Sequence, residues 1–434
     1  MRIVSITAGA GGMYCGSCIR DNALAKSLMQ MGHEVILVPL YTPPRTDGPS
    51  VSEQRVFFGG ISVYLEQYSA LFRATPWMVD RLWEAPWLLR AVSQRGVQTQ
   101  PERLGELTVS ILEGRHGRQR KEFDKLVYWL RTQAVPDVID LSNSMLISLA
   151  PALKAATGRP ICCTLQGENI FLDHLSEPYR SRALGLIQGH ARSVDRFIAV
   201  SDYYAGHMAQ YLRIPGAKVD VVPLGIAVDG FALRDGTAST PFTIGYLGRI
   251  APEKGVHLLC DAYRRLREQG ELEGCCLELA GYLGPEHRAY FEGIRRQIDK
   301  WGLESEMHYR GPLEFDEKVS FLQALDIFAV PATYDDPKGL ALIEAMACGV
   351  PVVAARRGTY VELIERTGGG VLTPPDDPEA LKAELVRLKN DATMRRALGE
   401  RGAAAVREHY SAEVMAHRAL DVYHRLHSTA SGSV

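Results

Sequence analysis

Short apolar runs alternate with amphipathic stretches along most of this chain. In the first half, the apolar runs are flanked by turn residues and predict strands. We expect them at 3–7, 34–39, 138–141, 161–165, 196–200 and 219–222. Apolar residues at helical spacing predict helices at 19–31, 144–156 and 203–211, of which the first two end at Gly32 and Gly158.

The second half starts the same alternation again. We expect strands at 243–247, 277–280, 307–309, 327–330, 350–354 and 370–372. Helices are expected at 256–269, 285–301, 314–324 and 340–348, with more from Pro378 onward. Such alternation is typical of parallel sheets with helices on both faces.

The segment 223–241 is rich in glycine, proline and aspartate and is the predicted hinge. We therefore predict an α/β fold of two Rossmann-like, doubly wound domains facing across a cleft, over residues 1–225 and 226–412. Residues 413–434 are expected to form a C-terminal helix, which could cross back to the first domain, and a mobile tail. The last twenty residues, rich in Ser, Thr, Ala and Gly, are expected to be mobile.

Residues 42–135 interrupt the pattern and are predicted to be an insertion in the first domain. A hairpin is expected at 56–65, and helices near 76–93 and 118–132. Three tryptophans interleaved with arginines in 76–93 could touch a membrane surface. An aromatic face packed on its own domain is the favoured alternative, because Asp80 and Glu84 interrupt any basic face.

Composition narrows the function classes. The chain has 434 residues, a formal net charge of −2, 46% hydrophobic and 23% charged residues, which argues against bulk nucleic-acid binding. No apolar run approaches a membrane span, and the first apolar run is too short for a secretory core. Reduced thiols and a cytoplasmic location are expected. The pair Cys15-Gly-Ser-Cys18 could be redox-active or half a metal site, but no second motif completes it.

The most informative stretch is Tyr334–Ala354, which predicts a turn, a helix and a strand. Free N–H groups at the start of such a helix attract anions. Asp336 lies just before the predicted helix, and Glu344 lies about two turns further on. A phosphate ester with hydroxyl groups on both sides, such as a nucleotide sugar, would use all three features.

A second loop supplies cations. Gly245–Gly255 leaves a predicted strand and enters a predicted helix, and it holds Arg249 and Lys254. Arginine grips phosphate oxygens with a two-pronged fork, and lysine adds a compact charge. Cations placed there would stabilise a departing nucleoside diphosphate as its bond to a sugar breaks.

Together, the motifs Gly248-Arg249…Lys254-Gly255 and Asp336-Pro-Lys-Gly-Leu…Glu344 resemble the retaining glycosyltransferase family 4, which has the GT-B fold. The resemblance spans nearly the whole chain, is specific in the second half, and is loose over 42–135. It implies a glycosyltransferase of carbohydrate biosynthesis that uses a nucleotide-diphosphate sugar, with a UDP-sugar as the expected donor.

The resemblance also assigns residues. Arg249 and Lys254 would bind the diphosphate, Asp336 the donor sugar hydroxyls, and Glu344 the ribose. Lys338, where the family often has an aromatic residue, would add a third cation. The remaining donor-binding positions would be Gly12, Gly248, Gly281, Arg310, Gly311, Gly339 and Leu340.

Two positions depart from the family pattern. Asp336 stands where glutamate is usual and is one methylene shorter. Gln166, in Thr164-Leu-Gln-Gly167, stands where the family has a histidine near the transferred sugar. Glutamine can donate a hydrogen bond but cannot carry a proton, which argues against acid–base work at 166.

Acceptor binding is expected in the first half. Tyr14, Glu168 and Asn169 could orient the acceptor, and Glu168 and Asn169 could equally be helix-capping residues. The acceptor and the oligomeric state stay open.

Retention in the family is usually explained by attack on the face that the leaving group departs from, with the leaving phosphate taking the acceptor proton. No metal or other cofactor is expected. Adjacent Asp335 and Asp336 could be read as a Mg²⁺ pair, but neighbouring side chains rarely converge on one ion without further ligands.

Three rival functions remain at this point. A dehydrogenase is suggested by Gly9-Ala-Gly-Gly12 after a strand, although the expected ribose-binding acid is missing. A same-fold epimerase or phosphorylase shares the architecture but not the reaction. A catalytically inactive nucleotide-sugar-binding protein is suggested by Gln166 and Asp336.

Overall fold

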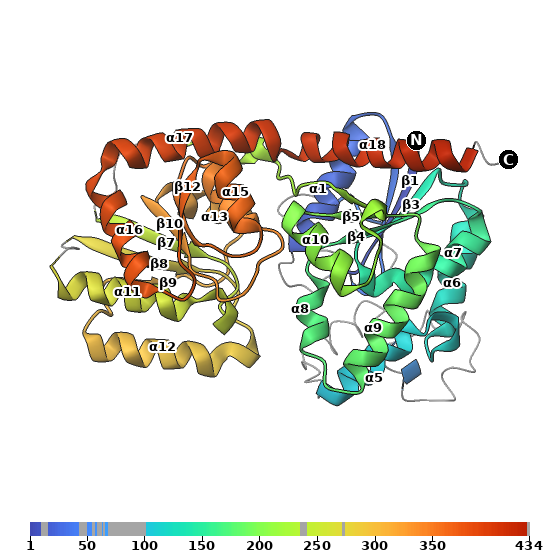
Figure 1. Cartoon of the computed structure of the whole chain (residues 1–434), viewed down its shortest axis with the longest axis horizontal. Coiled ribbons are helices and arrows are strands. Elements are labelled where there is room, and N and C mark those ends of the chain that lie inside the picture. The colour runs from blue at the N-terminus through green and yellow to red at the C-terminus, as the bar shows by residue number, and fades with distance from the viewer. Residues whose placement is uncertain are drawn as a thin grey trace. The chain divides into compact units, whose positions relative to one another are not determined.

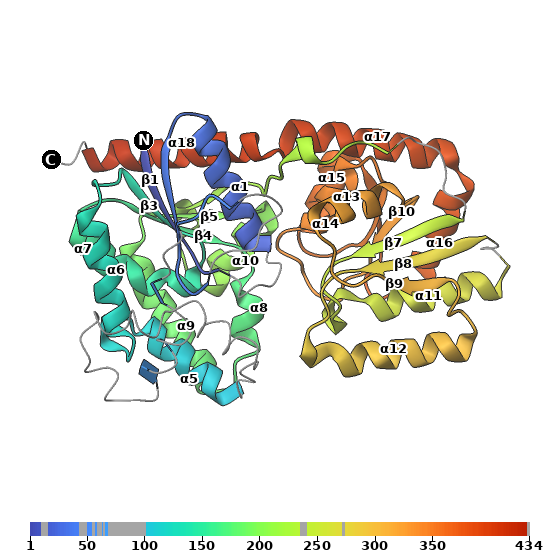
Figure 2. The same cartoon turned by 180° about the vertical axis from the view of Figure 1, so that it is seen from behind.

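A computed structural model describes residues 1–9, 16–42, 50–53, 57–58, 63, 66–67, 101–234, 241–270 and 274–431. The chain forms two compact units, drawn from opposite sides in Figures 1 and 2. Unit 1 comprises Met1–Pro223 and Ala416–Val434, and unit 2 comprises Leu224–Met415. The sequence placed the corresponding boundaries at 225/226 and 412/413.

Unit 1 is built on a six-stranded parallel sheet with the order β2-β1-β3-β4-β5-β6. Its strands are β1 (Arg2–Thr7), β2 (Glu34–Pro39), β3 (Val138–Leu141), β4 (Ile161–Leu165), β5 (Arg196–Ala199) and β6 (Val219–Val221). Every residue of β4 is buried, as expected for a strand covered on both faces. That burial is why the strands read as continuous apolar runs in the sequence.

Helices of unit 1 are α1 (Gly16–Gln30), α5 (Pro101–Leu112), α6 (Arg120–Thr132), α7 (Ala150–Thr157), α8 (Glu168–Asp173), α9 (Tyr179–His190) and α10 (Asp202–Tyr211). The single helix predicted at 144–156 is wrong. A 3₁₀ helix, η3 (Ser144–Leu149), is followed there by α7, because Pro151 sits in the first turn of a new helix. Figure 1 shows these helices around the strands of unit 1.

Unit 2 has a second six-stranded parallel sheet, with the order β12-β11-β10-β7-β8-β9. Its strands are β7 (Phe242–Leu247), β8 (Cys275–Ala280), β9 (Met307–Tyr309), β10 (Ile327–Val330), β11 (Val352–Ala355) and β12 (Gly370–Thr373). Its helices are α11 (Val256–Glu268), α12 (Arg288–Trp301), α13 (Phe315–Gln323), α14 (Leu340–Ala347), α15 (Thr359–Thr367), α16 (Pro378–Asn390) and α17 (Ala392–His409). On α11, Val256, Leu259, Tyr263 and Leu266 form a buried stripe at helical spacing.

The predicted mobile tail is wrong over most of its length. Helix α18 (Ala412–Ser431) runs through it, and only 432–434 lie outside the described residues. Met415, Ala419, Tyr423 and Leu426 of α18 are buried at helical spacing, so the helix is held by an apolar face despite its Ser/Thr/Ala-rich end. Figures 1 and 2 both show α18 beside the strands of unit 1.

The predicted hinge is not a free linker over its first residues. Leu224, Ile226 and Phe231 are buried within unit 2. Ile226 pairs with Ser411 in a parallel bridge, so the two segments that leave unit 2 run side by side. The rest of the predicted hinge, 235–240, lies outside the described residues.

The insertion is described only in part. The helix predicted at 118–132 is present as α6, and α5 precedes it without having been predicted. The helix predicted at 76–93, with its tryptophans, lies outside the described residues, as does most of the hairpin predicted at 56–65.

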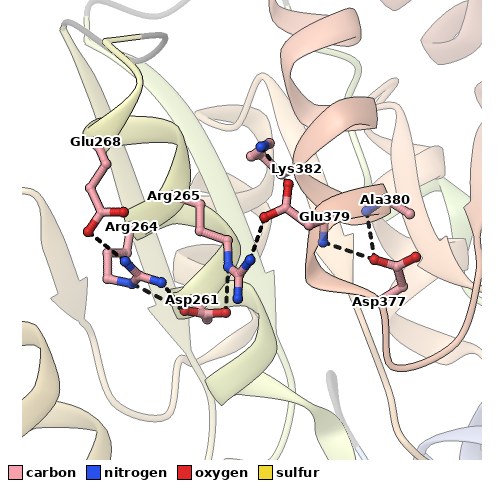
Figure 3. Close-up of polar contacts among 8 residues, drawn as sticks. All are labelled: Asp261, Arg264, Arg265, Glu268, Asp377, Glu379, Ala380 and Lys382. Atoms are coloured by element: carbon pink, nitrogen blue, oxygen red, sulfur yellow. Dashed lines mark hydrogen bonds and ion pairs between the residues drawn. The ribbon is translucent and has the colours of Figure 1, made fainter.

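Helices α11 and α16 are joined by a surface network of charges (Figure 3). Asp261 of α11 accepts hydrogen bonds from Arg264 at 2.8 Å and from Arg265 at 2.8 Å. Arg265 also pairs with Glu379 of α16, and Glu379 pairs with Lys382. Asp377 caps α16 through the backbone N–H groups of residues 379 and 380.

Candidate functional site

The donor-binding residues predicted in the second half all follow the carboxyl ends of unit 2 strands. Gly248 follows β7, Gly281 follows β8, Arg310 follows β9, and the loop that carries Asp336 follows β10. Because the strands are parallel, these loops lie at one edge of the sheet. This edge is where ligands bind in open α/β sheets.

Close backbone contacts join these loops. The Gly281 N–H donates to the Gly311 carbonyl at 2.8 Å. Gly281 has φ +131°, and a Cβ atom there would lie 1.9 Å from the Gly248 oxygen. A Cβ atom on Gly255, with φ +73°, would lie 1.8 Å from the Pro331 oxygen. Only glycine allows these approaches, so the loops after β7, β8, β9 and β10 form one packed rim.

Asp336 lies at the N-terminus of α14. Its Oδ1 accepts the backbone N–H groups of Lys338 at 2.9 Å and Gly339 at 3.0 Å. Gly339 has φ +64° and leads directly into Leu340, the first residue of the helix. The predicted helix mouth is therefore present, with the Asp336 carboxylate bound to the turn that precedes it.

Lys254 reaches the same carboxylate from the loop after β7. Its Nζ lies 2.7 Å from Asp336 Oδ2, donates to the Tyr334 hydroxyl, and lies 4.7 Å from the centroid of the Tyr334 ring. The Lys254 side chain is 18% exposed. An ammonium and a helix N-terminus thus converge at one point of the rim.

Asp336 carries its charge in a buried place. Burial alone would raise its pKa, but the Lys254 charge and the Gly339 N–H outweigh it and hold the pKa well below the usual range. The hydroxyls of Tyr334 and Tyr360 also donate to Oδ2. Burial, with the nearby carboxylate, raises the pKa of both tyrosines, so they stay neutral hydroxyl donors.

The Arg249 guanidinium has a different partner. Its Nη2 lies 2.5 Å from Glu253 Oε1, and 43% of its side chain is exposed. Tyr246 is a buried residue of β7. Its hydroxyl donates to the Arg249 carbonyl at 2.8 Å and fixes the backbone of this turn. Arg249 therefore shares the loop of Lys254, but its cation is held by an acid four residues on.

Glu344 is also buried and paired. Its Oε1 lies 2.7 Å from Nζ of Lys318 on α13, and Glu344 itself is 4% exposed. Lys318 Nζ lies 5.3 Å from the Phe315 ring and 5.6 Å from the Phe231 ring. Lys318 was not among the predicted site residues. The available signal was its place on the same helix face as buried Leu322, where a lysine needs a partner.

Arg310 pairs with an acid on the neighbouring strand. Its Nε and Nη2 lie 2.6 and 2.8 Å from the two carboxylate oxygens of Glu278. The Tyr309 hydroxyl donates to the Gly281 carbonyl at 2.7 Å. Beside β9 and α12 a pocket of about 470 Å³ opens. Its lining includes Leu279, Phe291, Arg295, Ile298, Met307 and Tyr309.

In unit 1, Gln166 follows β4 and is 3% exposed. Its Nε2 donates to the Ser142 carbonyl at 2.5 Å and to Asp21 Oδ1 at 3.2 Å. Both partners are acceptors, which fixes the amide nitrogen toward them. Oε1 is buried and has no hydrogen-bond partner among the described residues. Asp21 itself accepts from Arg20 at 3.1 Å, and this ion pair is buried.

Glu168 and Asn169 tie α8 to its neighbours. Glu168 Oε1 accepts the Ser144 N–H at 2.9 Å, and Oε2 accepts the Gln166 N–H at 2.9 Å. The Tyr204 hydroxyl donates to Asn169 Oδ1 at 2.8 Å. The alternative that both are helix-capping residues does not hold for α8, whose N-cap Gly167 receives no side-chain cap hydrogen bond. Glu168 instead accepts an N–H at the start of η3. Gly12 and Tyr14 lie outside the described residues.

Two negative findings apply to the part of the chain that the structure describes. No group of three or more His, Cys, Asp or Glu side chains there could hold a metal ion. None of the helices described is both long and apolar enough to cross a membrane. Cys18 is buried, and Cys15 lies outside the described residues.

Two glycosyltransferase family models match this chain, one in each half. Residues 234–405 match the model "Glycosyl transferases group 1", and residues 22–229 match the model "Glycosyltransferase Family 4". The first half of the chain therefore carries a family 4 glycosyltransferase domain, and the second half carries a group 1 glycosyl transferase domain. The predicted recognition is confirmed by these two matches, which between them span both units.

Relatives of this chain include a D-inositol 3-phosphate glycosyltransferase of Segniliparus rotundus, 30% identical over 48% of either chain. The putative colanic acid biosynthesis glycosyltransferase WcaL of Escherichia coli is 32% identical over 45% of this chain and 47% of that protein. The alignments with these two therefore span about half the length of the relatives. A phosphatidyl-myo-inositol mannosyltransferase of Mycobacterium leprae is 29% identical over 68% of this chain and 75% of its own.

Solved structures show the same fold. Sucrose-phosphate synthase of Thermosynechococcus elongatus has a TM-score of 0.72 at 19% identity, covering 99% of this chain and all of that one. Anabaena Alr3699/HepE, solved with UDP and glucose, has a TM-score of 0.67 at 18% identity and covers 97% of this chain and 99% of its own. The predicted α/β fold of the GT-B class is confirmed.

Proposed function

We propose that this glycosyltransferase moves a sugar from a nucleotide-diphosphate sugar to an acceptor. The observation that carries the proposal is the convergence of the Lys254 ammonium and the α14 N-terminus at the carboxyl edge of the unit 2 sheet. A helix N-terminus beside a cation is suited to a diphosphate, whose charge grows as it leaves the sugar. Relatives with glycosyltransferase names and neighbours solved with UDP support this assignment.

The two cations each have an acid partner before a ligand binds. Lys254 pairs with Asp336, and Arg249 pairs with Glu253. Glu253 keeps 27% of its side chain exposed, so Arg249 can exchange it for a phosphate oxygen. We propose that Arg249 turns to the diphosphate in this way, while Lys254 remains on Asp336 and contacts the same ligand.

A UDP-sugar is the expected donor, with Glu344 on the ribose and the backbones near Gly281 and Gly311 beside the base. We propose retention of configuration, with the leaving phosphate as the base for the acceptor hydroxyl. A metal ion is not required in this scheme, because the cations and the helix N-terminus supply positive potential. Gln166 is consistent with the leaving phosphate acting as the base, since an amide adds no titrating group. The acceptor is expected to bind unit 1, and the protein is expected to act in the cytoplasm.

Nucleotide binding tests the site. Lys254→Met and Arg249→Met should each weaken UDP binding about 10- to 100-fold in calorimetry, the loss expected for one charge-assisted hydrogen bond. Arg396→Met is the matched control, because Arg396 forms an exposed pair with Glu400 on α17. Unchanged UDP affinity in both site variants would refute the assignment. Incubating a UDP-sugar without acceptor would reveal epimerisation, and the anomeric signal of the transfer product would test retention.

A further inference from the structure

We propose that Asp336 is a positioning residue, which holds the Lys254 ammonium and the turn before α14 toward the donor diphosphate, and does not touch the donor sugar. This inference rests on the proposed function, and it replaces the sugar-binding role that the family resemblance implies. Four features of the Asp336 environment support it: the number of donors, the burial, the length of the side chain and the geometry at Lys254.

The Asp336 carboxylate is already saturated. Oδ1 accepts two backbone N–H groups, at 2.9 and 3.0 Å. Oδ2 accepts three further hydrogen bonds, from Lys254 Nζ at 2.7 Å, from Tyr360 at 3.2 Å and from Tyr334. A carboxylate offers about four lone-pair sites, so five donors leave no acceptor site for a sugar hydroxyl.

The carboxylate is also enclosed. Asp336 is 6% exposed. The Thr359 N–H donates to the Asp336 carbonyl at 2.9 Å. A Cβ atom on Gly358 would lie 2.6 Å from the same carbonyl oxygen, so the loop after β11 lies directly on this residue. A ligand reaching Oδ1 or Oδ2 would have to displace the loop after β7, the loop after β10 or the loop after β11.

Side-chain length fits this role. An aspartate can fold back on the next turn of its own backbone, as the bonds to the N–H groups of Lys338 and Gly339 show. A glutamate, one methylene longer, projects away from that turn. The aspartate that departs from the family pattern therefore serves the turn before α14, at the cost of reach toward a sugar.

Lys254 is oriented as a result. Two of its three ammonium protons are directed to Asp336 and to the Tyr334 hydroxyl, which itself donates to Asp336. This triangle fixes the ammonium, which otherwise ends a flexible four-carbon stem. With no third acceptor among the described residues, the remaining proton is left for a ligand at the rim. Asp336 would act on the diphosphate through Lys254.

Binding measurements can separate positioning from sugar contact. The affinity for UDP and for a UDP-sugar would be measured in the wild type and in Asp336→Asn, because UDP lacks the sugar that is transferred. Asparagine keeps an oxygen for the two N–H groups but turns an NH₂ group toward the ammonium and the two hydroxyls. We expect both affinities to fall about tenfold, and their ratio to change less than twofold.

A double-mutant cycle adds a second readout. Asp336→Asn should weaken UDP binding little or not at all in the Lys254→Met background, since its effect passes through Lys254. Asp335→Asn is the matched control, because it neutralises an exposed carboxylate in the same loop and keeps an oxygen for the Gly358 N–H. If Asp336→Asn folds poorly, Tyr334→Phe breaks the same triangle and should also lower both affinities equally.

Either of two results would overturn the inference. In the first, Asp336→Asn leaves the UDP affinity unchanged and reduces the UDP-sugar affinity tenfold or more. In the second, the effects of Lys254→Met and Asp336→Asn on UDP binding simply add. Failure of the proposed function looks different, because the wild type itself would then bind no nucleoside diphosphate.

Discussion

At the scale of single residues, Gln166 shows how one substitution changes the chemistry of a position. Its amide nitrogen faces a backbone carbonyl and the Asp21 carboxylate, and Asp21 is paired with buried Arg20. A neutral amide satisfies two acceptors there with one NH₂ group. A titrating side chain would have to change protonation in a place closed to water, next to an existing ion pair.

Gln166→Glu should destabilise the protein by roughly 2–4 kcal/mol at pH 7, because a carboxylate oxygen would replace the donor that faces Ser142 and Asp21. Acidification should protonate the new side chain and restore a donor, so part of the loss should be recovered near pH 5. Urea unfolding at both pH values measures this. Gln166→Met, similar in size and without a titrating group, should show a loss that is the same at both values. A pH-independent loss in Gln166→Glu would contradict this account.

The sequence predicts the charged residues of the rim better than their partners. Arg249, Lys254 and Asp336 stand in short local motifs, so their placement after strands could be read directly. Tyr360 and Lys318 act through contacts with residues 24 and 26 positions away, for which no local spacing gives a signal. The saturation of Asp336 is likewise a property of three loops together, and only the folded chain shows it.

At the scale of elements, strands were easier to predict than helices. A strand buried on both faces is continuously apolar, and each of the twelve strands in the sheet order lies where an apolar run predicted it. Helices α8, α9 and α15 were not predicted. Of α9, only Ala183 and Ile187 are buried, so the apolar stripe is too short to stand out.

The α11–α16 network separates two kinds of surface stabilisation (Figure 3). Arg265→Met keeps the apolar stem and removes the bonds to Asp261 and Glu379. Its effect on the midpoint of thermal unfolding should be small and should vanish in high salt, because exposed ion pairs are screened. Asp377→Ala removes the cap of α16 and should cost about 1 kcal/mol with little salt dependence. A larger, salt-resistant effect at Arg265 would contradict this ranking.

At the scale of the whole molecule, unit 1 is discontinuous. Its sheet comes from the first half of the chain, but residues 416–431 of α18 belong to it as well. The Tyr423 hydroxyl of α18 donates to Asp140 Oδ2 of β3 at 3.0 Å, across 283 residues. Arg425 pairs with Asp220 of unit 1 at 2.9 Å. Unit 1 is therefore complete only when the C-terminal helix has docked.

The Asp140 carboxyl at this contact gives the molecule a predictable pH dependence. Burial, together with the charge of Asp21, raises its pKa to about 6, against the opposing effects of Arg20 and of hydrogen bonds from Tyr423 and Thr164. In the unfolded chain an aspartate titrates near 4. The folded state thus holds the proton more tightly, so stability is lost as pH rises from about 4 to about 6 and changes no further above that, a total of about 3 kcal/mol.

Asp140→Asn removes this titration and retains an oxygen for the Tyr423 hydroxyl. Its stability relative to the wild type should therefore improve by about 2 kcal/mol between pH 4.5 and pH 7, measured by denaturant unfolding at each pH. Tyr423→Phe removes a hydrogen bond that favours the carboxylate, so the drop in stability should shift to higher pH in that variant. If the difference in free energy of unfolding between Asp140→Asn and the wild type did not change with pH, water or Arg20 would already keep the Asp140 carboxylate charged.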